Sequence, residues 1–81
     1  MIVRVRLFAA ARQAAECDVV EMELPEPVTV ADVRRQLASR FPALETWAAH
    51  LLFALNHHYV TDDVPVTTEA ELAGFPPVSG G

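Results

Sequence analysis

The 81-residue sequence has no lysine, one cysteine and three glycines, and each shortage limits what the chain can do. All six basic residues are arginines, against eleven aspartates and glutamates, which gives a formal net charge of -5. Phosphate binding needs a basic face, so nucleic acid is not an expected partner, whereas a partner with a basic surface is. The missing lysines have a simple interpretation, which is a genome that favours arginine codons.

The single thiol, Cys17, can neither close an internal disulfide nor build a zinc site, and we interpret it as passive. No apolar run approaches the roughly 18 residues of a membrane span. The start, MIVRVRLF, lacks the apolar core and the cleavage site of a signal peptide. We therefore expect a chain without membrane contact in the reducing cytoplasm.

The length allows one domain with one small core, since such a chain buries roughly 60% of the surface that its unfolded form exposes. A deep internal active site is therefore not expected. The sequence has no phosphate-binding glycine loop, no zinc-ligand spacing and no serine, histidine and aspartate combination. We expect this chain to bind neither a cofactor nor a metal.

Two segments near the start alternate apolar and polar residues with a period of two, which predicts strands at 2–8 and 19–25. Ile2 and Phe8 fall on the arginine face of the first, so that face is not purely polar. The segment 9–18 shows no alternation and predicts a loop or a ragged helical turn. We expect the two strands to form a hairpin through this long connection.

The segment TVADVRRQLASRF predicts the main helix, with Thr29 as N-cap and Asp32 as the acidic partner of a capping box. Pro42 should end the helix. The apolar residues at helical spacing are Val30, Val33, Leu37 and Phe41.

The second half predicts a short helical turn at 43–50, a buried central strand at 51–56 and a short strand at 57–61. A polar, turn-rich stretch follows, and a last short strand precedes Pro76. One helix against one face of a mixed sheet is the economical packing for this order. We therefore predict an α+β fold, a ubiquitin-like β-grasp at 1–75, followed by an extended tail at 76–81.

Several side chains of the body could be interpreted as sites, and the simpler interpretation is preferred for each. His57 and His58 are adjacent, so in a strand they would point to opposite faces and could not share a metal. The carboxylate pairs are interpreted as a solvated acidic rim and the two large aromatics as packing residues. These residues are Asp62, Asp63, Glu69, Glu71, Trp47 and Phe53.

The end of the chain, FPPVSGG, is a poor end for a packed fold. Gly80 and Gly81 offer a slim backbone that can enter a channel where any Cβ would clash. Pro76 and Pro77 favour an extended course, and the four residues beyond them reach roughly 13 Å. The last carboxylate could therefore enter another protein's active site. An external enzyme would have to convert one of its oxygens into a leaving group, for instance by adenylation with ATP.

These residues resemble the small-subunit family of molybdopterin synthase, the sulfur carriers of molybdenum-cofactor biosynthesis. FPPVSGG is similar to the family's terminal signature, and LLFALN to its central strand. VRLFAAAR and TVADVRRQLASRFP also match in type and position, so the resemblance spans the chain. TTEAEL, at 67–72, departs from the acidic or glycine-containing turn that members often carry, which affects only surface detail.

The resemblance implies that an adenylyltransferase similar to ubiquitin-activating enzymes adenylates Gly81, and that a sulfur donor protein converts it to a thiocarboxylate. The tail would enter the large subunit of a heterotetramer and give sulfur to cyclic pyranopterin monophosphate, where the large subunit would hold the catalytic residues. Gly80 would be the slim spacer. The segment that leads into the partner would be Phe75, Pro76, Pro77, Val78 and Ser79.

Two alternatives share this fold and terminus: a sulfur carrier for thiamine or tRNA thiolation, and a ubiquitin-like modifier conjugated to protein lysines. The Pro-Pro-Val-Ser approach to the glycines favours the molybdenum branch. In each case the activated carbonyl would be exposed to amines, so the missing lysines would limit self-conjugation.

Overall fold

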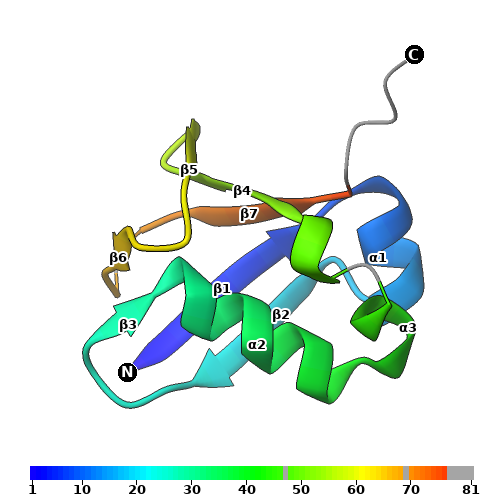
Figure 1. The fold of residues 1–81 in the computed structure, drawn as a ribbon, viewed down its shortest axis with the longest axis horizontal. Helices are drawn as coiled ribbons and strands as arrows, with labels where there is room; N and C mark the ends of the chain where they lie inside the picture. Colours follow the sequence, from blue (N-terminus) through cyan, green and yellow to red (C-terminus); the bar gives the residue numbers. More distant parts are fainter. Residues whose placement is uncertain (47, 69, 77–81) are drawn as a thin grey trace.

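The computed structural model describes residues 1–46, 48–68 and 70–76, and its main feature is a five-stranded mixed sheet (Figure 1). The strand order is β2-β1-β7-β4-β5; β1 and β7 are parallel, and the other neighbours are antiparallel. The strands are β1 (Ile2–Leu7), β2 (Val19–Glu23), β4 (Leu52–Leu55), β5 (His58–Val60) and β7 (Leu72–Phe75). This arrangement confirms the predicted mixed sheet. The short last strand, β7, lies in its centre.

The alternation in β1 has the expected consequence for burial. Val3, Val5 and Leu7 are buried beneath the helices, whereas Arg4 and Arg6 are exposed on the opposite face. Phe53 of β4 is also buried in this core, as predicted. The helices therefore cover one face of the sheet and leave the other open.

The connection between β1 and β2 is a helix, α1 (Ala9–Ala15), where the sequence predicted a loop or a ragged turn. Alanine has the highest helix propensity, and Ala11 and Ala15, four residues apart, bury the side that faces the core. Glu16 ends α1 in the left-handed conformation, with φ of 59°. The antiparallel pairing of β1 with β2 agrees with the predicted hairpin.

The main helix, α2 (Val30–Arg40), starts as predicted. Asp32 Oδ2 accepts hydrogen bonds from the backbone N–H of Thr29, at 2.9 Å, and from its hydroxyl, at 3.1 Å. The backbone bond is the main cause that lowers the pKa of Asp32 below its ordinary value. Pro42 ends α2 and opens a short helix, α3 (Pro42–Glu45), because proline is tolerated in a first helical turn. A 3-10 helix, η1 (Ala48–His50), follows.

A second, two-stranded sheet was not predicted. β3 (Val28–Thr29) pairs antiparallel with β6 (Pro65–Val66). Of the two, β6 lies inside the stretch that was predicted to be only polar and turn-rich. Val28 and Val66 are partners in this pairing and both are buried. One buried valine per strand is too little periodicity to reveal a strand in the sequence.

Asp62 is exposed, as the predicted acidic rim requires, and it also belongs to a hydrogen-bonded network. Arg34 Nη2 donates to Asp62 Oδ1 at 2.7 Å and Arg34 Nε to Asp62 Oδ2 at 3.2 Å. Arg34 Nη1 also donates to the carbonyl oxygens of Ala48 and Leu51, at 2.7 and 2.8 Å. Arg34 therefore ties α2 to η1, to the start of β4 and to the loop after β5.

Some predictions fall on positions whose structure is not described. The tail is described only at Pro76, so the division into 1–75 and 76–81 stays a prediction. Trp47 and Glu69 also lie outside the described residues. Within the described ranges, no helix is long and apolar enough to cross a membrane.

Candidate functional site at the end of strand β7

The tail follows the central strand of the sheet, and the end of that strand is held from both sides. Gly74 pairs with Leu7 of β1, and Phe75 pairs with Leu52 of β4. The backbone N–H of Phe8 adds a hydrogen bond to the carbonyl oxygen of Gly74, at 3.2 Å. The tail therefore begins from a fixed point.

Close packing surrounds Gly74. A Cβ at this position would lie 3.1 Å from Leu7 Cδ2 and 3.4 Å from Phe53 Cε1, both core side chains. The missing side chain lets the helix-covered face of β7 approach its two neighbours, so that the strand end sits tightly over the core.

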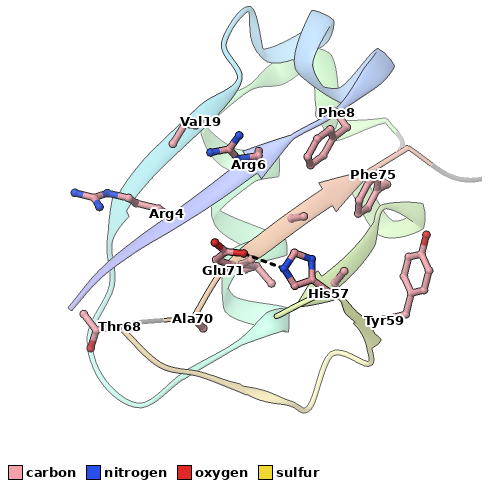
Figure 2. Close-up of a pocket in the computed structure, with 13 residues that line it drawn as sticks. Arg4, Arg6, Phe8, Val19, His57, Tyr59, Thr68, Ala70, Glu71 and Phe75 are labelled. Atoms are coloured by element: carbon pink, nitrogen blue, oxygen red, sulfur yellow. Dashed lines mark ion pairs between the residues drawn. The ribbon is translucent and has the colours of Figure 1, made fainter.

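Three aromatic side chains gather on the open face at the end of β7 (Figure 2). We call Phe8, Tyr59 and Phe75 the aromatic cluster. The rings of Phe8 and Phe75 are stacked, with centroids 4.9 Å apart and an angle of 8° between their planes, and Tyr59 lies at 6.1 Å from Phe75. Phe8 is 38% exposed and Tyr59 71% exposed. An exposed aromatic group of this kind is typical of an interaction surface.

The aromatic cluster lines a hollow of the open face, and polar side chains line the rest of this hollow. Arg4 and Arg6 line it from β1, and His57 and Glu71 line it from the far side (Figure 2). His57 Nε2 lies 3.3 Å from Glu71 Oε2, and both side chains are exposed. The predicted surface position of His57 is therefore confirmed, and His58 is exposed as well.

The acidic groups whose pKa values are lowered lie away from the hollow. The two carboxyl groups with lowered pKa values, Asp32 and Asp63, do not line it, and the pKa of Asp63 is lowered chiefly by a hydrogen bond from the Thr61 hydroxyl. The residues that the structure describes contain no group of three or more histidine, cysteine or acidic side chains able to hold a metal.

The predicted site residues divide at Pro76. Phe75 ends β7, and Pro76 follows it in a half-buried position. Five predicted residues lie outside the described part of the chain: Pro77, Val78, Ser79, Gly80 and Gly81. Sequence reasoning missed Phe8 and Tyr59 as neighbours of Phe75; the one signal was the position of Phe8 on the arginine face of β1.

Comparison with known proteins gives the context of this site. The ThiS family model matches residues 5–81, which includes β7 and the whole tail. This chain belongs to the ThiS family. A molybdopterin synthase sulfur carrier subunit from Arabidopsis thaliana is 35% identical over 79 residues, which cover 98% of this chain and 82% of the relative.

Solved structures share the fold. SAMP1 from Haloferax volcanii, a small archaeal modifier protein, matches with a TM-score of 0.86 and 28% identity over 100% of both chains. A complex of subunits 1 and 2 of molybdopterin-converting factor from Helicobacter pylori contains a chain that matches with a TM-score of 0.67 and 22% identity, also over 100% of both chains. These neighbours confirm the ubiquitin-like β-grasp.

Proposed function

We propose that this chain is the sulfur carrier subunit of a molybdopterin synthase and that the carboxyl carbon of Gly81 carries the sulfur. The observation that supports this most is the family match, which continues to Gly81, together with the named carrier that is 35% identical over 98% of the chain. The open face adds a second argument, since its described residues form a contact surface beside the start of the tail.

The proposed chemistry begins at the last carboxylate, which is a poor electrophile while ionised. An oxygen of Gly81 attacks the α-phosphorus of ATP in an adenylyltransferase similar to ubiquitin-activating enzymes, and pyrophosphate leaves. A sulfur nucleophile at the oxidation level of hydrosulfide, delivered by a sulfur donor protein, then attacks the acyl carbon. AMP leaves with the electron pair of the broken C–O bond, and a thiocarboxylate remains.

In the large subunit, the thiocarboxylate sulfur attacks a side-chain carbon of cyclic pyranopterin monophosphate. The new C–S bond forms as a C–O bond at that carbon breaks, and the oxygen leaves with the electron pair of the broken bond. Water cleaves the resulting thioester, which leaves the sulfur on the pterin and returns the carboxylate of Gly81. Two such donations build the dithiolene. Gly80 keeps the backbone narrow, so that the reacting carbon can reach a channel that excludes side chains.

The aromatic cluster is the proposed docking surface for the large subunit and for the activating enzyme. Its three rings are exposed or half-buried next to the point where the tail leaves, so a partner that holds the rings also receives the tail. The net charge of -5 favours encounter with a basic partner surface. We propose that this pairing occurs in the cytoplasm and forms a heterotetramer of two carriers and two large subunits.

The likeness to SAMP1 supports a second candidate function, a modifier that is conjugated to protein lysines. It differs from the first only in the group that attacks the activated Gly81, an amine in place of sulfur. A carrier for thiamine or tRNA thiolation would share the thiocarboxylate but pass its sulfur to another acceptor.

Intact mass spectrometry separates these functions. The chain is incubated with its activating enzyme, ATP and a sulfur donor, and we expect a species about 16 Da heavier, because sulfur replaces one oxygen. Pull-down with the large subunit and formation of thiolated pterin then identify the molybdenum branch. A ladder of conjugates without the heavier species would contradict the proposal and support the modifier.

A further inference from the structure

We infer that Phe8 is a positioning residue for sulfur delivery, because its ring fixes the strand end from which the tail leaves. The inference rests on the proposed function of the tail. It adds a role inside the chain to a side chain that would otherwise count only as surface.

The first argument is the way β1 and β7 continue beyond their paired residues. The parallel pairing runs from Val5 opposite Leu72 to Leu7 opposite Gly74. The backbone N–H of Phe8 then donates to the carbonyl oxygen of Gly74, and the ring of Phe8 stacks on that of Phe75. Phe8, the residue directly after β1, thus extends the contact between the two strands by one hydrogen bond, and Phe75 is the last residue of β7.

The second argument is that the backbone of Phe8 is itself fixed. The chain turns sharply at Ala9, where φ is 52°, and enters α1 at once. The carbonyl oxygen of Phe8 accepts hydrogen bonds from the N–H groups of Ala11 and Arg12, at 3.1 and 3.4 Å. The backbone N–H of Phe8 is therefore hydrogen-bonded to β7 and its carbonyl oxygen to α1. These bonds fix the backbone that carries the ring.

The third argument is the geometry of the ring pair. Offset stacking of aromatic rings is an attractive arrangement with a restricted orientation, and here the planes of Phe8 and Phe75 differ by only 8°. An aliphatic side chain in place of the Phe8 ring would restrain Phe75 less, because it has no flat face to stack on. Phe8 is 38% exposed and is not among the buried core residues, so its ring contacts Phe75 at the surface of the sheet.

A fixed strand end matters because the reacting carbon lies six residues beyond it. The six residues from Pro76 to Gly81 span roughly 20 Å when extended, and two of them are prolines that limit bending. Disorder at Phe75 would spread the directions in which the tail starts, and a displacement of about 1 Å at a reacting atom can slow a reaction up to 100-fold. The stack therefore favours a productive approach of Gly81.

The test compares Phe8→Leu, which keeps an apolar side chain without a flat ring, with Phe8→Tyr, which keeps the ring. Each variant is prepared as the thiocarboxylate, and single-turnover sulfur transfer is followed against the concentration of the large subunit. We expect Phe8→Leu to lower the rate at saturation about tenfold and Phe8→Tyr to restore it. Ile2→Ala is the matched control, because Ile2 is an exposed apolar residue on the same face at the other end of β1.

A second readout does not depend on sulfur chemistry. Backbone ¹⁵N relaxation of the free protein should show the order parameter of Phe75 falling from about 0.85 toward 0.6 in Phe8→Leu and unchanged in Ile2→Ala. Unchanged order at Phe75 would overturn the inference. The inference would also be overturned if Phe8→Leu raised only the large-subunit concentration at half-maximal rate and left the rate at saturation unchanged. That result would assign Phe8 to docking alone. Failure of the wild-type thiocarboxylate to transfer sulfur would instead contradict the proposed function.

Discussion

A single missing side chain shapes the start of the tail. Gly74 lies between Leu7 and Phe53, and both neighbours are among the most deeply buried residues of the core. Protein cores are packed at the density of organic crystals, so two further methyl groups at this point have no space to occupy. The requirement is steric, since the backbone of Gly74 is part of a regular strand.

The corresponding prediction is that Gly74→Val lowers the free energy of unfolding by about 1–3 kcal/mol, as overpacked cores do. The matched control is Ala73→Val, because Ala73 is half-buried and adjacent, and its side chain lies on the open face. The control should change stability by less than about 0.5 kcal/mol, since valine suits a strand surface. Urea denaturation measures both, and equal losses would show that packing at Gly74 is not special.

Among the secondary-structure elements, α2 carries the contacts that join the two halves of the chain. Arg34 is only 18% exposed along its side chain, whereas Asp62 is 50% exposed. The guanidinium also lies over the Phe53 ring, with the Cζ atom 5.0 Å from the centroid. Its planar group satisfies two carbonyl oxygens and one carboxylate at once, which an ammonium group cannot do with the same geometry.

We expect Arg34→Lys to lower the free energy of unfolding by about 1–3 kcal/mol, because one ammonium group cannot reproduce the guanidinium hydrogen bonds to Ala48, Leu51 and Asp62 together. Asp62→Asn should cost less than about 1 kcal/mol, since an exposed ion pair contributes little. Chemical denaturation of the two variants checks the order. A larger loss in Asp62→Asn would show that the ion pair, and not the carbonyl contacts, stabilises this junction.

The start of α2 makes stability depend on pH. The hydrogen bonds from Thr29 hold the pKa of Asp32 below 3.8 in the folded chain, so the ionised carboxylate favours folding. This contribution is complete above the unfolded pKa, near 4, and is lost as the pH falls through the lower folded value. Asp32→Asn should therefore flatten the decrease in unfolding free energy between pH 4 and pH 2, measured by urea titration. An unchanged slope would contradict this assignment.

The main helix and the first two strands were predictable because their signals are local. Period-two alternation fixed β1 and β2, and the pair Thr29 and Asp32 fixed the start of α2. The helix α1 was missed because an alanine-rich segment shows no apolar period, and β3 and β6 because each has two residues. Pairings of this kind depend on contacts between segments far apart in the chain.

The site was predictable only in part. The Gly-Gly terminus and its approach are sequence features and need no fold to be seen. The aromatic cluster was not visible, because it joins Phe8, Tyr59 and Phe75 from three strands or strand ends. Only the parallel pairing of the first and last strands brings Phe8 beside Phe75, and no local pattern indicates that pairing.

At the scale of the whole molecule, the proposed function assigns the chemistry to Gly81 and leaves the folded body as a scaffold. The scaffold offers few nucleophilic amines: the sequence has no lysine, and the amino group of Met1 donates a hydrogen bond to the carbonyl oxygen of Leu24, at 2.8 Å. An activated carbonyl at Gly81 therefore meets few competing amines on its own chain. This effect follows from the absence of lysine, whether or not codon usage is the cause of that absence.

Introducing an amine near the tail should create a by-product. Arg6 lies opposite Ala73 in the sheet, close to the strand from which the tail leaves, and is exposed on the open face. We expect Arg6→Lys, after activation with ATP in the absence of a sulfur donor, to yield an isopeptide-linked product with loss of AMP, whereas the wild type yields none. Intact mass and fragment mapping detect it. Equal amounts in both proteins would remove the support for this role of the missing lysines.

The most direct measurement is sulfur transfer by a chain that lacks only Gly81. Wild-type and shortened chains are compared for formation of the thiocarboxylate and of thiolated pterin, and thermal unfolding is recorded in parallel. Our account predicts that the shortened chain unfolds at the same temperature as the wild type and transfers no sulfur. Thiolated pterin formed by the shortened chain would contradict the account, because the reacting carbon would then lie elsewhere.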